Sequence, residues 1–413
     1  MNPDPTRVPL RAVTREVDTI EDAVACAAPA DPLVWSRRGD TLVGGGAAAH
    51  FPGSDPAATA QWWRRVSAAA EIDDPVGLPG TGLVAFGALP FDPRSARTGG
   101  LIVPSVIVGR RGDRSWVTRI GETGVPTLPP ATPYGPHWSA TLGPGTLTPA
   151  GYQTAVRAAL DAIARGDVGK VVLARDLAGS APAASDLRRL VRALATAYPD
   201  TWTFAVAGLI GASPETLVTV SGGTVTTRVL AGTAARGADA DEDTAASLRL
   251  ATSAKDLDEH QYAVHSVLTA LRPFTNALVA AEEPFALKLP NVWHLATDAE
   301  GTLDAASSAL DLVGALHPTA AVAGTPTAAA RELIGRLEPF DRGCYSGPVG
   351  WIDANGDGEW AIALRCAQFG PSGPGERIPV VAHAGAGIVA GSDPETEMLE
   401  TRVKFRPVVD ALA

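Results

Sequence analysis

The chain has 413 residues, of which 46% are hydrophobic and 19% are charged, so its composition is that of a globular protein with a substantial buried core. Its formal charge of −11 and the lack of a basic stripe argue against nucleic acid as a partner. No apolar run could span a membrane and no apolar signal core begins the chain, so we expect a soluble, cytoplasmic protein. Three cysteines without paired spacing argue against a disulfide framework and a zinc site.

Lysine is rare in this chain. Of the 34 basic residues only Lys170, Lys255, Lys288 and Lys404 are lysines, and the others are arginines. An arginine stays protonated at any working pH, whereas a buried lysine can lose its proton and act as a base. Lys170 begins the apolar run KVVLAR and is therefore a candidate for chemistry; the alternative is an ordinary cation at a strand edge.

The N-terminal part alternates short helical and strand-like pieces, such as the helical pattern at 58–72 and the strand pattern at 100–111. Residues 121–148 are rich in proline and glycine, which predicts a linker that crosses the surface. We therefore expect an N-terminal α/β segment, 1–147, that packs onto a catalytic core at 148–413.

The elements become clearer from Thr148 onward. Thr148 can cap a helix that has Pro149 at its first position and keeps apolar residues at helical spacing until Gly166. A buried strand, hairpins at Gly222-Gly223 and at the NGDG turn, and helices at about 253–274 and 326–338 follow. Hairpins interspersed with helices predict an α+β fold with mainly antiparallel sheets.

The segment HAGAGIVAGSDPETEMLETRVK, 383–404, suggests a strand, then a loop with glycines at 385, 387 and 391, then a helix, as in a nucleotide-binding turn. A dinucleotide site needs a second parallel strand after that helix, and too few residues remain after Gly391 to form one. A possible phosphate loop at Gly169-Lys170 has Val171 where Ser or Thr is required. Nucleotide binding is therefore excluded, and the glycine-spaced segment must hold something else.

Two helices carry acid pairs at i, i+3 spacing: Asp256 with Glu259, and Glu397 with Glu400. Each pair can simply be a favourable acid–dipole interaction at a solvated helix N-terminus. If the four carboxylates converge, they would form an all-oxygen site suited to Mg²⁺, which keeps water ligands that an anionic substrate can share.

Three further residues stand in unusual surroundings. Glu215 follows Ser213-Pro214 at the mouth of a strand, where an ordinary turn acid is the alternative. Arg365 lies in the otherwise apolar strand AIALRCAQ, and a buried arginine needs an anion, either a structural carboxylate or a substrate one. From the residues alone, His294 is expected to be a structural histidine and Tyr345 a core residue.

Nine motifs occur in the chain in a single order: KVVLARDL, GASPETLV, LAGTAARG, KDLDEHQYAV, NVWHLATD, LHPTAAVAGTP, EPFDRGCYSGPVGW, ALRCA and HAGAGIVAGSDPETEMLETRVK. With these motifs the chain resembles the chorismate-utilising enzymes, and most closely the isochorismate synthases of menaquinone and siderophore pathways. The resemblance is strong over 148–413 and weak before it. It implies one α+β unit in which two large antiparallel β-sheets pack together with helices on the outside.

The resemblance also implies a reaction and its catalytic residues. Isochorismate synthases add water to C2 of chorismate and release the C4 hydroxyl. Lys170 would be the base that activates water, and Glu215 the acid that protonates the leaving hydroxyl. Burial favours a neutral amine and a protonated carboxyl together at neutral pH.

The remaining site residues follow from the same resemblance. Glu259 and Glu400 would bind Mg²⁺ directly, and Asp256 and Glu397 would reach it through water. The resemblance places further residues around chorismate: Gly232 and Thr233 at the pocket floor, His294 near the ring, Tyr345 and Arg365 on the enolpyruvyl carboxylate, and the amides of Gly385, Ala386 and Gly387 with Lys404 near the bound carboxylates.

Position 170 separates branches of the family. Ammonia-using members typically carry Gln there, so Lys170 together with Ala231 favours water as the nucleophile. We therefore expect no glutamine amidotransferase subunit. For the oligomeric state, our default expectation is a monomer. Salicylate synthases share these motifs and also eliminate pyruvate, so that activity stays open as an alternative. A non-catalytic protein that binds chorismate or a metal is the alternative from another class.

Overall fold

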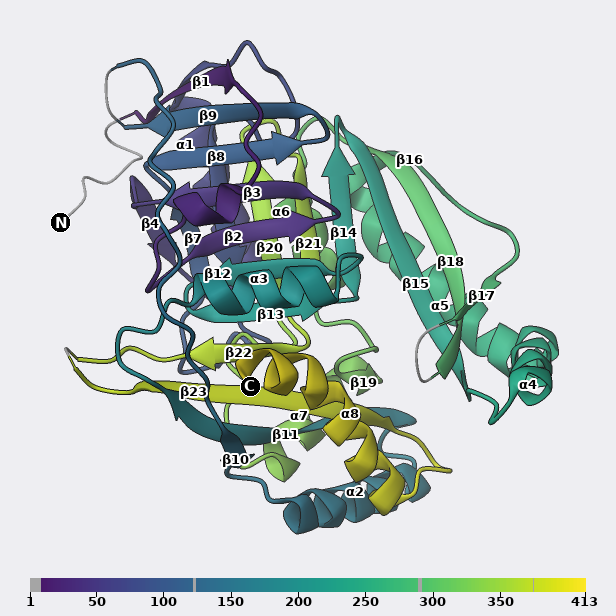
Figure 1. The fold of residues 1–413 in the computed structure, drawn as a ribbon. Coiled ribbons are helices and arrows are strands. Elements are labelled where there is room, and N and C mark those ends of the chain that lie inside the picture. Colours follow the sequence, from purple (N-terminus) through teal and green to yellow (C-terminus); the bar gives the residue numbers. More distant parts are fainter. Residues whose placement is uncertain (1–8, 122–123, 289–291, 374) are drawn as a thin grey trace.

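The computed structural model describes residues 9–413 except 122–123, 289–291 and 374; the side chains of Thr233, Ala235, Lys255, Glu259 and Val292 also lie outside the described part. Two large sheets dominate the molecule, and helices cover their outer faces (Figure 1). Every ladder between described strands is antiparallel except that of β1 with β5, so the predicted α+β fold with two antiparallel sheets is confirmed. No described helix is long and apolar enough to cross a membrane.

The first sheet runs through twelve strands in spatial order. These are β10 (Leu142–Pro144), β11 (Lys170–Ala181), β23 (Ile378–Ile388), β22 (Cys366–Phe369), β13 (Leu209–Ser213), β12 (Trp202–Val206), β2 (Leu33–Arg37), β3 (Asp40–Gly45), β8 (Val106–Arg111), β9 (Arg114–Ile120), β1 (Arg11–Val17) and β5 (Glu71–Asp73), and β19 (Gly324–Thr325) pairs with β11 beside this path.

The second sheet contains ten described strands. In spatial order they are β16 (Thr275–Ala280), β18 (Val292–Leu303), β15 (Thr224–Ala235), β14 (Thr216–Ser221), β21 (Gly358–Ile362), β20 (Pro348–Asp353), β6 (Val84–Ala88), β7 (Gly100–Val103) and β4 (Ala49–Pro52), and β17 (Phe285–Lys288) pairs with β18. Strands from both sides of residue 148 therefore build both sheets: β2 pairs with β12 in the first sheet, and β6 pairs with β20 in the second.

Eight α-helices and two short 3-10 helices are described. They are η1 (Ala23–Cys26), α1 (Pro56–Ala69), α2 (Pro149–Ala164), α3 (Arg188–Ala197), α4 (Ala240–Thr252), α5 (Ala254–Leu271), η2 (Arg272–Phe274), α6 (Ala309–Leu316), α7 (Thr327–Leu337) and α8 (Pro394–Leu412). The predicted start of α2 is confirmed, because the Thr148 side chain accepts a hydrogen bond from Gly151 N at 3.1 Å and Pro149 opens the helix.

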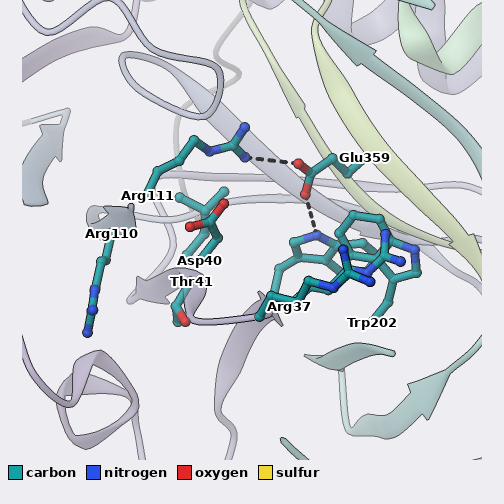
Figure 2. Close-up of a pocket in the computed structure, with 10 residues that line it drawn as sticks. Arg37, Asp40, Thr41, Arg110, Arg111, Trp202 and Glu359 are labelled. Atoms are coloured by element: carbon teal, nitrogen blue, oxygen red, sulfur yellow. Dashed lines mark hydrogen bonds and ion pairs between the residues drawn. The ribbon is translucent and has the colours of Figure 1, made fainter. Parts of the chain in front are cut away.

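The large core lies between the sheets, where side chains such as Trp63, Trp116, Trp351 and Trp360 are fully buried. One acid ties the two sheets together at the edge of this core. Glu359 on β21 accepts hydrogen bonds from Trp35 Nε1 on β2 at 2.8 Å and from Arg111 Nη2 on β8 at 2.9 Å (Figure 2). A cavity of about 190 Å³ lies beside it, lined by the β2–β3 hairpin.

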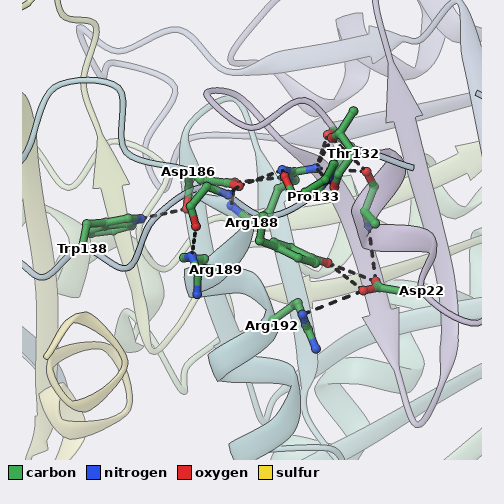
Figure 3. A network of polar contacts seen from close by, with 12 residues as sticks. Asp22, Thr132, Pro133, Trp138, Asp186, Arg188, Arg189 and Arg192 are labelled. Carbon is green, nitrogen blue, oxygen red and sulfur yellow. Dashed lines mark hydrogen bonds and ion pairs between the residues drawn. The ribbon is translucent and has the colours of Figure 1, made fainter. Parts of the chain in front are cut away.

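A network of hydrogen bonds centred on one arginine fixes the proline-rich segment that was predicted to be a linker. Arg188 at the start of α3 donates to Asp186 Oδ2 at 2.7 Å, to Thr132 Oγ1 at 2.7 Å and to the carbonyls of Ala25 and Pro133 at 3.0 Å (Figure 3). The described part of this segment is therefore held by a network of hydrogen bonds.

The sequence prediction for residues 385–388 was wrong. Gly385 and Gly387 lie inside β23, paired with Ala174 and Val172 of β11, and the turn before α8 comes only after Ile388. A methyl group at Gly385 would lie 2.5 Å from the Leu173 carbonyl oxygen, so this glycine serves close contact between strands.

Candidate functional site

The site begins where two neighbouring strands of the first sheet separate. β22 pairs with β23 only at Val380–Ala382, because the chain before Cys366 turns away to the second sheet. Gly370 N donates to Pro379 O, so the odd-numbered residues of β23 direct their backbone groups toward β22. Beyond Ala382 these groups face the space that β22 has left.

Two backbone crossings form the opposite wall of this space. The chain passes from β13 to β14 through Pro214 and Glu215, and from β21 to β22 through Ala363 to Arg365. The crossings run side by side: Ile362 N donates to Glu215 O at 3.0 Å, and Ala212 N donates to Arg365 O at 3.2 Å. Arg365 has a φ of 51°, a rare backbone conformation for a side chain of this size.

Glu215 is the acid of this wall. Its backbone N–H donates to Ser213 Oγ at 3.2 Å, and that hydroxyl donates to Ile362 O at 2.6 Å, which fixes the crossing. Burial raises the pKa of the Glu215 carboxyl, while the positive charges of Lys170, Lys404 and Arg365 oppose that rise. The carboxyl is therefore surrounded by three cations and still tends to keep its proton.

Lys170 lies at the start of β11, next to Gly387 of β23. A methyl group at Gly387 would come within 3.1 Å of Lys170 Cε, so the lysine side chain lies against this glycine. Lys170 and Lys404 act electrostatically on both Glu215 and His294, which places these four residues around one space.

Helix α8 contributes Glu397, Glu400 and Lys404 from its first turns. Lys404 Nζ donates to Gly385 O at 2.8 Å and pairs with Glu400 Oε1 at 2.5 Å, so it joins the helix to the separated strand. Burial raises the pKa of Glu397, and the negative charge of nearby Glu400 adds to the rise. Two carboxylates so close together favour a cation near them.

Arg365 and Tyr345 complete the wall opposite α8. Burial lowers the pKa of the Arg365 guanidinium, while Tyr345, Glu400 and Glu215 raise it, so all three face this cation. Arg365 forms no ion pair with any described residue, and a half-buried cation without a carboxylate partner is suited to an anionic ligand.

The second sheet closes the space through β15 and β18. Gly232 has a φ of 77° at a bulge where the register with β18 shifts, and its carbonyl accepts from His294 Nδ1 at 3.3 Å. Burial lowers the pKa of His294, and the positive charges of Lys170 and Lys404 lower it further, so the imidazole is neutral. Asp256 on α5 lies against Gly232, 3.4 Å from the position of a methyl group there.

The predicted metal ligands are divided between two helices. Asp256 belongs to α5, whereas Glu397 and Glu400 belong to α8, and among the described residues no three His, Cys, Asp or Glu side chains gather closely enough to hold a metal ion. The side chains of Glu259 and Thr233 lie outside the described part, so these two assignments stay predictions. The donors that are described are carboxylates, which fit the chemistry of Mg²⁺.

The loop that carries Tyr345 is fixed by a buried ion pair that the sequence analysis did not identify. Arg342 donates to Glu338 Oε1 at 2.6 Å and to the carbonyl of Val172 at 2.7 Å, and Glu338 accepts from Ala174 N at 2.7 Å. Both residues therefore join this loop to β11. Their i, i+4 spacing in EPFDRGCYSG was a usable signal.

Ala386 was predicted to contribute its backbone amide, and the structure does not bring that amide to this space. The residue is fully buried, and as an even-numbered residue of β23 it directs its backbone groups toward Leu173 of β11. The structure thus gathers Lys170, Glu215, Arg365, Tyr345, Lys404, Glu400, His294 and the backbone of Gly385 and Gly387 around one space.

Comparison with known proteins agrees with this arrangement. The family model described as "Chorismate binding enzyme" matches residues 135–413. A Mycobacterium tuberculosis protein that carries the provisional name isochorismate synthase MenF is 40% identical over 347 residues, which cover 81% of this chain and 87% of that protein. Isochorismate synthase DhbC of Bacillus subtilis is 42% identical over 276 residues, covering 64% of this chain and 68% of that protein.

A solved structure shares the whole architecture. The menaquinone-specific isochorismate synthase MenF of Escherichia coli superposes with a TM-score of 0.77 at 25% sequence identity, over 98% of this chain and 95% of that one. Since the family model covers well over half of the chain, the chain belongs to the chorismate-binding enzyme family.

Proposed function

We propose that this protein is an isochorismate synthase, which converts chorismate to isochorismate in a Mg²⁺-dependent reaction. The observation that supports this best is the position of Lys170 and Glu215 around a space also lined by Arg365 and Lys404. The reaction adds water at C2 and releases the C4 hydroxyl. It needs a base and an acid that act on the same ring.

The acid and the base follow from the surroundings of each side chain. Glu215 has a carboxyl whose pKa is raised by burial, so it can hold a proton and give it to the leaving C4 hydroxyl. Lys170, as a neutral amine, would take a proton from the attacking water. Each transfer is expected to contribute about 10²–10⁴-fold to the rate.

The anionic substrate would be held by cations and by backbone groups. Arg365 forms no ion pair with any described residue and faces Tyr345, so it is suited to the enolpyruvyl carboxylate. The odd-numbered backbone groups of β23 at Gly385 and Gly387 face the same space, where they would meet an anion held there. Lys404 Nζ, which donates a hydrogen bond to Gly385 O, supplies a further positive charge.

Glu400 would hold Mg²⁺ together with Glu259, and Asp256 and Glu397 would reach it through water. When bound, the ion would neutralise part of the charge of the ring carboxylate. His294 would contact the substrate directly, and not through the Mg²⁺ ion. Its neutral imidazole donates from Nδ1 to Gly232 O, so its Nε2 can accept a hydrogen bond near the ring.

Product analysis tests the proposal directly. Purified protein with chorismate and Mg²⁺ should form isochorismate, and Lys170→Ala and Glu215→Gln should each lower kcat at least about 100-fold. Lys288→Ala, which removes another of the four lysines on an exposed strand, is the matched control and should leave kcat unchanged. Wild-type turnover retained by Lys170→Ala and Glu215→Gln would contradict the assigned roles.

The same assay separates the alternatives. Salicylate and pyruvate among the products would identify a salicylate synthase, whose activity continues from the same intermediate. Measurable chorismate binding without any product would instead indicate a non-catalytic binding protein. We further propose that the protein acts as a monomer in the cytoplasm and without a glutamine amidotransferase subunit, so added glutamine should not change the product.

A further inference from the structure

One aromatic stack lies directly behind the candidate substrate site. The imidazole of His383 stacks on the ring of Tyr345, with 5.1 Å between the ring centroids and 25° between the planes. The same imidazole lies 5.0 Å from the ring of Phe340, tilted by 44°. His383 thus contacts two aromatic rings of the loop that follows α7.

The imidazole of His383 is not used as a polar group within the described protein. Among the described residues its nitrogens make no hydrogen bond, and the ring contacts the two aromatic side chains instead. Burial lowers the pKa of His383 to about 4, so at neutral pH the ring is uncharged. A neutral ring with no hydrogen-bond partner acts on its neighbours through shape and stacking.

The stack connects the two walls of the site. His383 is on β23, two residues before Gly385, so the two positions lie on the same face of the strand. Tyr345 belongs to the loop fixed by Arg342 and faces Arg365, which forms no ion pair with any described residue. His383 therefore holds the Tyr345 ring against the separated strand, and the Arg342 guanidinium lies 6.0 Å from the centroid of the same ring.

Given the proposed function, we infer that His383 is a positioning residue, whose stacking holds the Tyr345 hydroxyl toward the carboxylate of chorismate. The hydroxyl is well suited to donate, because burial raises the pKa of Tyr345 to about 12 and keeps it protonated. His383 acts only through Tyr345 and touches no substrate atom. Its effect belongs to substrate binding, since a carboxylate distant from the reacting carbons is held equally in the ground and transition states.

Three variants test this role through the KM for chorismate. His383→Ala removes the stack and should raise KM about three- to tenfold with kcat changed less than about twofold. His383→Phe restores a ring of similar shape without nitrogens and should return KM to within about twofold of the wild-type value. In the Tyr345→Phe background, His383→Ala should add less than about twofold, because the hydroxyl that it positions is already gone.

A matched control separates positioning from loss of stability. Phe51 stacks on Trp62 with the same 5.1 Å between centroids and 20° between planes, far along the chain in β4 and α1. Phe51→Ala should lower Tm to a degree comparable with His383→Ala and leave KM unchanged. If both variants raise KM alike, the effect on KM is one of general stability and the inference is wrong.

Chemical rescue gives an independent test. His383 lines a cavity of about 210 Å³ together with Asp176 and Gln368, which gives a small molecule access to the position of the missing ring. Added imidazole should lower the KM of His383→Ala toward the wild-type value and should not affect Phe51→Ala. No rescue, together with a His383→Phe variant as impaired as His383→Ala, would overturn the inference.

The wild-type assay keeps this inference separate from the proposed function. Formation of isochorismate by the wild-type protein with a wild-type KM in His383→Ala would refute positioning alone. Absence of product from the wild-type protein would refute the proposed function, and the equilibrium Kd of chorismate for the same variants would then decide the role of His383.

Discussion

Arg188 and Arg365 are two arginines in the interior of the same protein, and their surroundings differ. The side chain of Arg188 is only 1% exposed and donates to the Asp186 carboxylate, to the Thr132 hydroxyl and to four backbone carbonyls (Figure 3). Arg365 is half-buried and forms no ion pair with any described residue, although Glu215, Glu400 and Tyr345 lie within electrostatic range.

This difference indicates that Arg188 stabilises the fold, whereas Arg365 is suited to bind a ligand. Charge burial costs free energy unless hydrogen bonds and an opposite charge compensate for it, and Arg188 obtains that compensation within the chain. Burial lowers the pKa of Arg365 below its usual value, which shows that the fold does not compensate its charge fully. A substrate carboxylate can supply the missing partner.

The largest expected effect is on stability, at Arg188. Arg188→Met leaves the Asp186 carboxylate, whose side chain is 4% exposed, without its cation, and should lower the free energy of unfolding by about 3–5 kcal/mol in chemical denaturation. The double variant with Asp186→Leu should recover part of this loss, since it removes both charges. A loss below about 1 kcal/mol would contradict the structural role of Arg188.

The second effect is on activity, at Arg365. Arg365→Met should lower kcat/KM for chorismate about 30- to 1000-fold, which corresponds to a loss of about 2–4 kcal/mol of transition-state stabilisation. The reason is that it removes the charge expected to bind a carboxylate. Its free energy of unfolding should change little or rise, in contrast to Arg188→Met. Stability lost at Arg365 to the same degree as at Arg188 would remove the distinction between the two arginines.

The third effect is a pH dependence at Glu215. The folded protein holds the Glu215 proton above the usual pKa of 4.5, whereas the unfolded chain releases it there, so stability falls as pH rises from 4.5 to the raised pKa. Glu215→Gln has no proton to lose, and its stability relative to the wild type should therefore increase across that window. Denaturation curves at several pH values check this, and a difference that is constant with pH would contradict a raised pKa.

The smallest effect is expected at an exposed pair. Arg38 and Asp200 are joined at 2.8 Å with side chains 67% and 76% exposed, so water and salt screen their attraction. Arg38→Ala should change the free energy of unfolding by no more than about 0.5 kcal/mol and leave KM unchanged. A change as large as that at Arg188 would show that ion pairing, and not burial, governs the comparison.

Several elements could be predicted from local sequence because local interactions form them. The cap of α2 at Thr148 and the hairpin at Gly222-Gly223 depend on residues within a few positions of one another, and the structure confirms both. The sequence did not distinguish a loop from a strand at residues 385–388. The glycines are typical of a turn, but β23 pairs with β11 over its full length, and this pairing makes the glycines part of a strand. Long-range pairing decided this segment against its composition.

Motifs identified the predicted site residues, but contacts between distant parts of the chain determine how these residues are arranged. Lys170 and Glu215 could be identified from an unusual lysine and a strand-mouth acid, and the structure brings both to one space. His383 lies within the segment HAGAG, yet nothing in the sequence relates it to Tyr345, because the contact joins a strand to a loop in a different part of the chain.

The sequence by itself determined the family, the α+β class and most of the residue types that the chemistry needs, because motifs and hydrophobic spacing are local properties. Only the tertiary structure decided which charges find partners. β22 leaves β23 at Ala382, two crossings connect the sheets at Glu215 and Arg365, and the space between them holds cations that no described carboxylate neutralises in full. Pairing between distant strands fixes that space, and such pairing cannot be determined from neighbouring residues.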